Sequence, residues 1–191
     1  MLHEKAGYAH MDVKLENVLI DDQGTLKICD FGFSTPHNCP VNMRMGTPIY
    51  MAPEIHRAPV IPCEGQPSDV FSLGVLFFVL AFGAPPFKAA VSNDIYFNYL
   101  AMKPGNKDFF KYHPHTKLLY KAGKIPESFI DLMIKMLMAK PENRVKKLSE
   151  LLESDFLKLA EDQIDEQYRL VKNSQEELIK HSETKLNNGS D

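Results

Sequence analysis

Cysteine, net charge and long apolar runs are all scarce in this chain, and each scarcity excludes a class of protein. The three cysteines, Cys29, Cys39 and Cys63, are odd in number and lack the spacing of zinc ligands, so we expect free thiols in a reducing compartment. The formal net charge of −3 gives no electrostatic case for binding nucleic acid or an anionic membrane surface. The most apolar run, 70–82, is shorter than the roughly 20 residues that span a bilayer, which predicts a buried core helix instead.

Signals for export and for repetition are missing as well. The N-terminal stretch Met-Leu-His-Glu-Lys-Ala-Gly has no apolar core of a secretion signal, and no internal repeat or sustained heptad is found. The expected location is therefore the cytosol or the nucleus. The chain does have an apolar fraction of 44% over 191 residues, which is enough for the core of one ordinary domain.

Periodicity and chain breakers predict a mainly α-helical fold with one short β-hairpin. Residues 1–7 have the pattern of the last turn of a helix, and 17–20 and 25–29 that of two strands joined by a hairpin loop. The proline-containing stretch 33–50 is predicted to be a long loop, and loops of that length are usually functional.

Four further helices are predicted, at 69–82, 93–102, 126–140 and 148–159. Ser68 is expected to cap the first of them, and Gly83 to end it. Beyond this domain, the composition predicts a polar tail at 158–191. Its first part carries a weak apolar stripe of helical spacing, made by Ile164, Tyr168, Val171 and Leu178, and disorder is expected from His181 onward.

A polar segment before the first predicted strand carries residues with the chemistry of phosphoryl transfer. Asp12, Lys14 and Asn17 bring a carboxylate, an ammonium and a carboxamide that an irregular loop can turn toward one point. One hairpin later, Asp30 can return to the same point, and with Asn17 it would offer the hard oxygen ligands that Mg²⁺ prefers. Phosphoryl transfer needs metal ions on the phosphates, a carboxylate that holds the acceptor hydroxyl, and positive charge opposite the oxyanions.

The order of five segments resembles the eukaryotic protein kinase family. His10-Met11-Asp12-Val13-Lys14-Leu15-Glu16-Asn17 is similar to the catalytic loop of that family, and Asp30-Phe31-Gly32 to its metal-binding motif. Segments 46–54, 68–75 and 141–144 resemble the substrate-docking segment, the central helix and a distal arginine-bearing turn. The resemblance covers about residues 1–157 and implies a partial kinase domain, namely the large lobe, with a helical core and a hairpin that carries the catalytic and metal-binding loops.

The resemblance also implies a role for each residue of the active site. Asp12 would be the catalytic carboxylate, and Lys14 would steady the transferred phosphate. Asn17 and Asp30 would bind Mg²⁺, and Leu19 would lie beneath the adenine of ATP. Residues Gly46, Thr47 and Pro48 would dock the protein substrate.

Structural roles are implied for a second set of residues, namely His10, Phe31, Glu54, Asp69 and Arg144. Glu54 and Arg144 would form a buried ion pair that holds the docking segment. Asp69 would bind the backbone of the 10–12 loop, because a buried carboxylate needs partners. We also expect the Thr47 side chain to bond to Asp12 and Lys14 rather than to serve as a phosphorylation site.

The chain departs from the family pattern in two places. Met11 replaces an arginine that in this family pairs with a phosphate on the activation loop, so we do not expect phosphorylation to switch the protein through that position. No Gly-rich phosphate loop, strand lysine or adenine-binding hinge precedes the catalytic loop, so the small N-terminal lobe is not represented. Each lost contact costs several kcal/mol of transition-state stabilisation, so the 191 residues alone are expected to be inactive.

Two functions from different classes remain open at this point. The first is a serine/threonine protein kinase that transfers the γ-phosphate of ATP, with Mg²⁺, to protein hydroxyls; Lys14 resembles the serine/threonine kinases rather than the tyrosine kinases. The second is a non-catalytic module that binds the substrates or regulators of intact kinases. Expected partners are protein substrates, ATP and a missing or separate N-terminal lobe. The length of the natural chain and the binding of MgATP would discriminate between the two.

Overall fold

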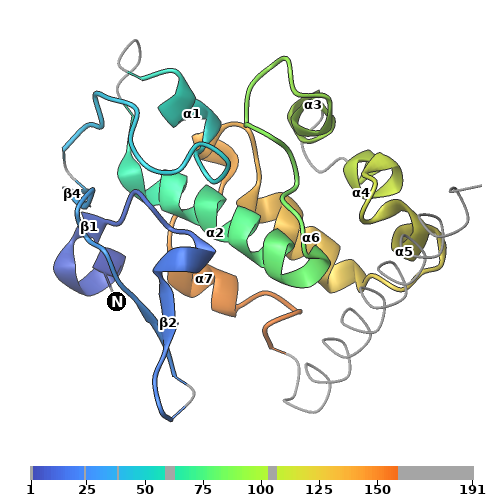
Figure 1. Cartoon of the computed structure of the whole chain (residues 1–191), viewed down its shortest axis with the longest axis horizontal. Helices are drawn as coiled ribbons and strands as arrows, with labels where there is room; N and C mark the ends of the chain where they lie inside the picture. Colours follow the sequence, from blue (N-terminus) through green and yellow to red (C-terminus); the bar gives the residue numbers. More distant parts are fainter. Residues whose placement is uncertain (1, 24, 38, 59–62, 103–106, 159–191) are drawn as a thin grey trace, which may run out of the picture.

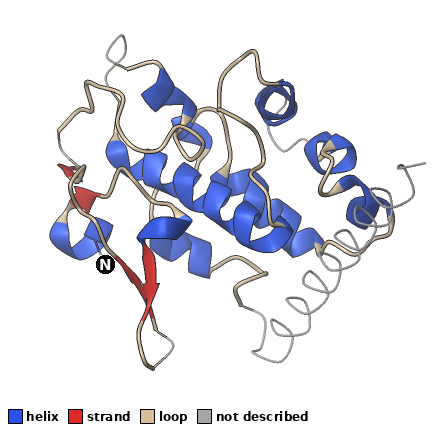
Figure 2. Cartoon of the chain, in the orientation of Figure 1, coloured by secondary structure: helices blue, strands red, loops and turns tan. Residues whose placement is uncertain are grey.

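The computed structural model describes residues 2–23, 25–37, 39–58, 63–102 and 107–158. Within these ranges the fold is mainly helical and contains two small sheets of two strands each (Figures 1 and 2). The mainly α-helical class predicted from the sequence is confirmed. The predicted tail lies outside the described residues from position 159 onward, so its stripe and its end stay predictions.

The strands lie in the first part of the chain, and the α-helices follow in the remainder. The first part of the chain holds η1 (Leu2–Ala6), β1 (Tyr8–Ala9), η2 (Leu15–Asn17), β2 (Val18–Ile20), β3 (Leu26–Ile28) and β4 (Thr35–Pro36). The remainder holds α1 (Pro53–His56), α2 (Gly65–Phe82), α3 (Ile95–Met102), α4 (Asp108–Tyr112), α5 (Lys117–Lys121), α6 (Glu127–Met136), η3 (Pro141–Asn143) and α7 (Leu148–Leu152).

Helix α2 runs through the middle of the molecule, with α6 and α7 beside it (Figure 1). By length and composition α2 could cross a membrane, but 72% of it is buried inside the protein, which is the position of a core helix. Its Phe71 and Phe78 are fully buried and stack against aromatic rings of neighbouring segments. Gly74 allows α6 to approach closely, because an added Cβ would lie 2.9 Å from the Met136 Cβ.

The predicted start of α2 was wrong, whereas its end is confirmed. The helix begins at Gly65, so Ser68 lies inside it and is not its cap. Pro67 is tolerated in the first turn because the N–H that it lacks would have no acceptor within the helix. The Ser68 Oγ instead lies within hydrogen-bond distance of Glu54 Oε1 (2.9 Å) and of the Glu64 carbonyl (3.1 Å), so its single O–H can donate to either acceptor. Gly83 ends the helix in the left-handed conformation, at φ 69°.

The predicted hairpin is present. A second pair of strands, β1 and β4, fixes part of the segment 33–50, which was predicted to be a loop. Strands β2 and β3 pair in antiparallel register, with Val18 opposite Ile28 and Ile20 opposite Leu26. Strand β4, within the predicted loop 33–50, pairs with β1 through Ala9 and Thr35. A single bridge between Val41 and Cys63 fixes the same segment further along the chain.

Helix α3 begins at Ile95 instead of 93, two helices end earlier than predicted, and three short ones were not foreseen. Helix α6 ends at Met136 instead of 140, because the Met138 and Ala139 carbonyls turn away and accept hydrogen bonds from Arg144. Helix α7 ends at Leu152 instead of 159. The short helices α1, α4 and α5 have four or five residues each, which is too few for an apolar period to show.

A buried histidine at the end of α4 makes stability depend on pH. Burial lowers the pKa of His113 to about 4, and the nearby His115 acts in the same direction. The His113 ring is 2% exposed and packs edge-on against Phe78 at 5.0 Å between centroids. The unfolded chain therefore takes up this proton first as the pH falls below the ordinary value of 6.5.

We predict that lowering the pH from 7 to 5 costs about 1 to 2 kcal/mol of unfolding free energy through this group, after allowance for solvent screening. His113→Phe keeps an aromatic ring but cannot take up a proton, so its stability should fall less over the same range. Urea denaturation of both proteins at pH 7, 6 and 5 measures the difference. Equal slopes with pH for the two proteins would contradict this account.

Candidate active site

Two segments that are distant in sequence, 12–17 and the one that holds Thr47, meet at the carboxylate of Asp12. Asp12 Oδ1 accepts hydrogen bonds from the Thr47 backbone N–H and from the Thr47 hydroxyl, both at 2.8 Å. Asp12 Oδ2 accepts from Lys14 Nζ at 2.6 Å. The Asn17 amide donates to the Asp12 carbonyl at 2.9 Å. The catalytic loop and the docking segment are therefore joined at the residue that the sequence assigns to catalysis.

The charges of this pair are fixed by their mutual contact. Burial opposes ionisation of Asp12, but the hydrogen bonds from Lys14 and Thr47 outweigh it and hold the pKa of Asp12 below its ordinary value. The hydrogen bond to Asp12 raises the pKa of Lys14, and the fields of Glu16 and Asp30 add to the effect. At neutral pH the site therefore holds a buried acceptor carboxylate beside a cation whose side chain is 21% exposed to solvent.

Asp69 at the start of α2 holds the backbone of the catalytic loop. Its carboxylate accepts from the backbone N–H groups of His10 (2.6 Å) and Met11 (2.7 Å), as the sequence led us to expect. His3 Nε2 lies 2.7 Å from the same carboxylate. Met11 has φ 68°, a left-handed conformation that is unfavourable for a side chain of this size, and these bonds stabilise it.

Met11 is buried in the hydrophobic core and not turned toward solvent. It is 6% exposed and packs in the same cluster as Ala9 and Val41. Gly65 makes room for it, because a Cβ there would lie 2.8 Å from the Met11 sulfur. The position that carries an arginine in the family thus contributes apolar packing here to the activation segment, residues 34–47.

Three further residues predicted to belong to the site, His10, Leu19 and Phe31, lie before, within and after the hairpin of β2 and β3. His10 is buried, and its ring lies 5.1 Å from that of Phe31. Phe31 itself is 52% exposed, so its packing in the described residues is only partial. Leu19 on β2 is likewise 53% exposed, which leaves its side chain available as a surface under a ligand.

Oxygen ligands for a metal ion are present, although the described residues contain no cluster of three or more His, Cys, Asp or Glu that could hold one. Asn17 uses its amide nitrogen on Asp12, which leaves its carbonyl oxygen as the atom for a ligand. Asp30 is exposed and sits at φ 63°, with Oδ1 bonded to the Gly32 N–H at 3.3 Å. One carboxylate and one carboxamide suit Mg²⁺, which takes its other ligands from phosphate and water.

Gly46 lets the docking segment reach the catalytic loop. It has φ 92°, and a Cβ at this position would overlap the Met11 carbonyl oxygen. We predict that Gly46→Ala lowers the unfolding free energy by about 3 kcal/mol or more, because it adds a steric overlap to an unfavourable φ.

Gly123→Ala is the matched control for this prediction. Gly123 also has a positive φ, 65°, but an added Cβ would meet nothing within 4 Å. It should therefore cost only the conformational term of about 1 kcal/mol. Urea denaturation of both variants measures the two costs, and equal losses would contradict a close approach at Gly46.

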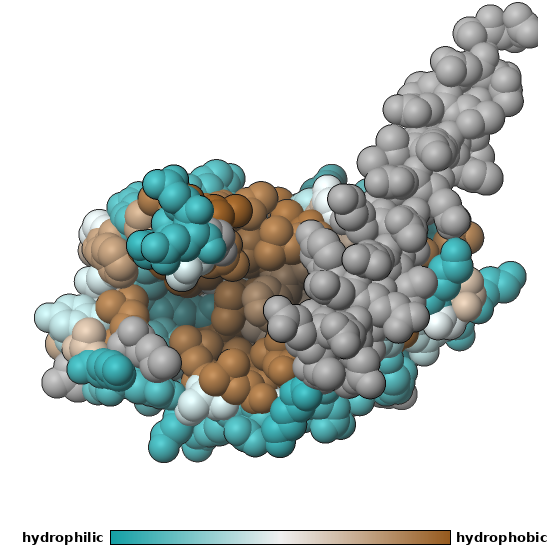
Figure 3. Space-filling model, turned by 90° about the horizontal axis from the view of Figure 1, so that it is seen from below, coloured by the Kyte–Doolittle hydropathy of each residue, from teal (hydrophilic) through white to brown (hydrophobic). Residues whose placement is uncertain are grey.

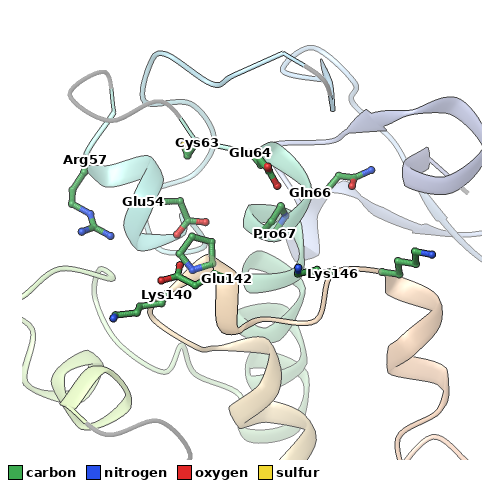
Figure 4. A pocket seen from close by; sticks show the side chains of 11 residues that line it. Glu54, Arg57, Cys63, Glu64, Gln66, Pro67, Lys140, Glu142 and Lys146 are labelled. Atoms are coloured by element: carbon green, nitrogen blue, oxygen red, sulfur yellow. The ribbon is translucent and has the colours of Figure 1, made fainter.

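The predicted ion pair is present and buried. Arg144 Nη1 lies 2.5 Å from Glu54 Oε1, and Arg144 Nη2 lies 2.7 Å from Glu54 Oε2. The pair ties α1 of the docking segment to the turn η3, which is distant in sequence. A mixed-charge pocket of about 800 Å³ opens beside Glu54, and Figure 4 shows Lys140, Lys146 and Glu142 around it.

Sequence reasoning missed the parts of the site that carry no motif. The His3 contact to Asp69 was not foreseen, because a lone histidine in a short helical turn gives no signal. The contact of Ser68 with Glu54 was hidden by its interpretation as a helix cap. Gly65 offered the one usable hint, since a glycine within a helix often marks a close approach.

Comparison with known proteins places this geometry in a family. The protein kinase domain model matches residues 1–157. The chain is 33% identical to the serine/threonine-protein kinase CHK1 of Mycosarcoma maydis over 144 residues, which are 73% of this chain and 20% of that protein. It is 34% identical to the serine/threonine-protein kinase PAK 5 of Rattus norvegicus over 163 residues, which are 83% of this chain and 20% of that protein. The match to CHK1 of Saccharomyces cerevisiae is 31% over 153 residues, with 75% and 26% of the two chains covered.

The chain belongs to the protein kinase family, and the three relatives described above are named as serine/threonine-protein kinases. It spans only a fifth to a quarter of the length of these relatives. ATP and Mg²⁺ are the usual cofactors of this family.

Proposed function

We propose that this member of the protein kinase family provides the large lobe of a serine/threonine kinase, which transfers the γ-phosphate of ATP to serine or threonine hydroxyls of proteins. The observation that carries the proposal is the convergence on Asp12 of Lys14, Thr47 and Asn17, at 2.6 to 3.3 Å. A buried, ionised carboxylate at this point accepts the hydrogen bond of an incoming hydroxyl. The adjacent ammonium is placed to face the oxygens of the transferred phosphate.

The other residues take their roles from their place around Asp12. Asn17 and Asp30 would hold Mg²⁺, which when bound neutralises charge on the phosphates of ATP. Leu19, exposed on β2, would lie under the adenine. Thr47, with Gly46 and Pro48, would place the protein substrate opposite Asp12. We assign residues 1–157 to this catalytic lobe and 158–191 to a tail, and we place the protein in the cytosol or the nucleus.

A small N-terminal lobe would complete the nucleotide site. The hairpin presents Leu19, Ile20 and Leu26 at 53%, 70% and 65% exposure, a large apolar surface for a water-soluble protein. We propose that this surface, together with Asp30, faces a lobe that supplies the Gly-rich loop and the strand lysine, either in a longer protein or from a separate chain. Tested alone, the 191 residues should show no phosphoryl transfer.

The decisive experiment isolates the protein from its source cells and measures its intact mass and its activity together. A mass above 21.7 kDa, upstream peptides with a Gly-rich loop, and MgATP-dependent transfer to serine or threonine peptides would support the kinase. A mass of 21.7 kDa without MgATP binding would overturn it. The second candidate, a non-catalytic module that binds the partners of intact kinases, would then stand, favoured by the same exposed apolar surface.

The activation segment should work without a phosphate on it. The Met11 side chain is buried beside Val41 and offers no charge to a phosphate, while β4 and the bridge of Val41 to Cys63 already fix the segment. We predict that phosphatase treatment of the purified kinase leaves its rate unchanged. The control is a serine/threonine kinase that carries an arginine at this position, which should lose activity under the same treatment. Loss of activity together with release of a phosphate from 34–47 would contradict the prediction.

A further inference from the structure

The pocket beside Glu54 has no part in the catalysis proposed above. Its volume is about 800 Å³, and it lies between two segments that are distant in sequence, 54–67 and 140–147. Asp12, Lys14 and Thr47 do not line it. Figure 3 shows apolar residues around a hollow on the lower face of the molecule, whereas the pocket beside Glu54 is lined largely by charged side chains. Its occupant must therefore be sought by charge.

The buried side chain of Arg144 holds the walls of this pocket together. Its guanidinium donates to the Glu54 carboxylate in α1, to the Pro67 carbonyl in the first turn of α2 (2.9 Å), and to the Ala139 carbonyl before η3 (3.3 Å). The side chain of Arg144 is fully buried, so these bonds are shielded from water. The pocket is therefore preformed, and a ligand does not have to order its walls on binding.

The opening of the pocket carries an excess of positive charge. Four exposed cations line it, namely Arg57, Lys140, Lys146 and Lys147. Glu64 and Glu142 are the carboxylates that oppose them, because Glu54 is neutralised by Arg144. In the part of the chain that the structure describes, none of the four cations forms an ion pair. The excess is thus available to a ligand, although the formal net charge of the whole chain is −3.

These cations are spread along the opening instead of converging on one point. Figure 4 shows Arg57 and Lys140 toward one end and Lys146 toward the other. A single phosphate is a compact anion that is held best by converging donors, and above all by a bidentate arginine. Arg57 already donates its Nε–H to the Pro53 carbonyl at 3.3 Å. Separated cations fit an anion whose charges are separated as well.

Between the charged ends, the lining is neutral. Cys63, Pro67 and Pro141 contribute to it. Burial raises the pKa of the Cys63 thiol to about 11, so this side chain adds no negative charge at neutral pH. A neutral floor between two cationic ends suits an extended peptide, whose backbone and aliphatic atoms lie over the floor while its carboxylates reach the ends.

A membrane or a nucleic acid fits this pocket less well than a peptide does. A flat lipid surface cannot enter a concavity between two chain segments. A long polyanion would also extend beyond the opening and meet the rest of a chain with net negative charge, which repels it.

We propose that the pocket between α1, the start of α2 and η3 binds an extended acidic segment of a partner protein. One carboxylate of this segment lies opposite Lys140 and another opposite Lys146, and the atoms between them cover Pro67 and Pro141. This inference does not rest on the proposed function, because it requires neither ATP nor catalysis.

The test measures binding of a fluorescent peptide of alternating glutamate and serine to the full 191-residue chain, by fluorescence anisotropy. At an ionic strength of about 0.1 M, charges farther than about 10 Å from the peptide are largely screened. Lys140→Glu combined with Lys146→Glu should raise the Kd about tenfold or more, because two attractions become repulsions.

Lys117→Glu combined with Lys121→Glu is the matched control. It makes the same change of net charge on exposed positions of α5, which Figure 1 shows well apart from α1. This pair should change the Kd by less than about twofold. Equal weakening by the two pairs would show a general effect of charge and would overturn the site. If the first pair fails to fold by circular dichroism, Lys140→Gln combined with Lys146→Gln takes its place and should raise the Kd about threefold.

Amide hydrogen exchange locates the bound peptide. A saturating concentration should slow exchange severalfold in α1 and in 142–147 and leave α5 unchanged. Protection of α5 instead, or of neither region, would overturn the proposal. So would the absence of binding at about millimolar peptide.

Three further ligands decide the chemistry of the occupant. A peptide of alternating lysine and serine should not bind, and equal binding of it would contradict selection for acidic residues. A serine peptide with one phosphoserine should bind more weakly than the glutamate peptide; tighter binding would show a compact anion site. A single-stranded oligonucleotide that binds more tightly than the glutamate peptide, and that the first pair of substitutions weakens, would show a nucleic acid as the occupant. Either of these last two results would overturn the proposal.

Discussion

Arg144→Met should lower the unfolding free energy of this protein by about 3 to 5 kcal/mol. The guanidinium satisfies the Glu54 carboxylate and also donates to the carbonyls of Pro67 (2.9 Å) and Met138 (2.6 Å). It lies 4.9 Å from the centre of the Phe71 ring as well. Methionine replaces the apolar stem but leaves a buried carboxylate that keeps its hydrogen bond from the Ser68 hydroxyl and loses its counter-ion. Urea denaturation monitored by circular dichroism measures the loss.

A second substitution separates the charge from the packing. Glu54→Met combined with Arg144→Met removes both charges, so the double variant should be more stable than Arg144→Met alone. Glu153→Gln is the control for a charge pair in water. Glu153 and Lys158 form an ion pair at 2.8 Å with both side chains more than half exposed, so its loss should leave the unfolding free energy almost unchanged. If Arg144→Met cost no more than this control, the buried pair would not hold the docking segment.

The ion pair of Glu54 and Arg144 illustrates what could be predicted from the sequence and what could not. Glu54 and Arg144 lie far apart in the chain, so no local period joins them; only the resemblance of two short segments to a family did. The contact is present, but one of its consequences was not foreseen. Arg144 draws the Met138 and Ala139 carbonyls to itself, and α6 therefore stops at Met136, four residues before the predicted end at 140.

The start of α2 was predicted less well than its end. Serine is a common residue at the N-cap of a helix, which is why Ser68 was predicted to cap α2. The helix begins earlier, at Gly65, where it packs against Ala9 and Met11. Strand β4 was missed because a pair of two residues shows no alternation. By contrast, the hairpin and the end of α2 at Gly83 were predicted closely, since turn residues and a left-handed glycine are local signals.

The conformation of the catalytic loop lay beyond sequence reasoning. Met11 adopts φ 68°, which no propensity favours for methionine. The reason is found in Asp69, whose carboxylate binds two successive N–H groups of the loop, and in the space that Gly65 leaves for the methionine sulfur. The loop is thus held by a residue of α2, and Asp12 follows directly from it. The position of Asp12 is therefore set by the core as well as by its own segment.

Asp12→Asn should lower kcat by about 10²- to 10⁴-fold. The substitution is made in the gene of the native protein, and the variant is purified from its source cells. Asparagine keeps the shape of the side chain and one carbonyl oxygen for the Thr47 N–H, so the loop should stay in place. It removes the negative charge that would hold the acceptor hydroxyl and that now pairs with Lys14 at 2.6 Å. The KM for ATP should change little, because the nucleotide is assigned to Leu19, Asn17 and Asp30.

Asp22→Asn is the matched control for this prediction, because Asp22 is exposed in the turn between β2 and β3. It makes the same chemical change outside the site, and its rate should equal that of the unaltered kinase. Initial rates with a serine peptide over a range of ATP concentrations separate kcat from KM. A raised KM with an unchanged kcat would show that Asp12 binds substrate without taking part in transfer. If instead Asp12→Asn matched Asp22→Asn in both parameters, the contacts around Asp12 would be structural only, and the interaction module would explain this carboxylate better than catalysis does.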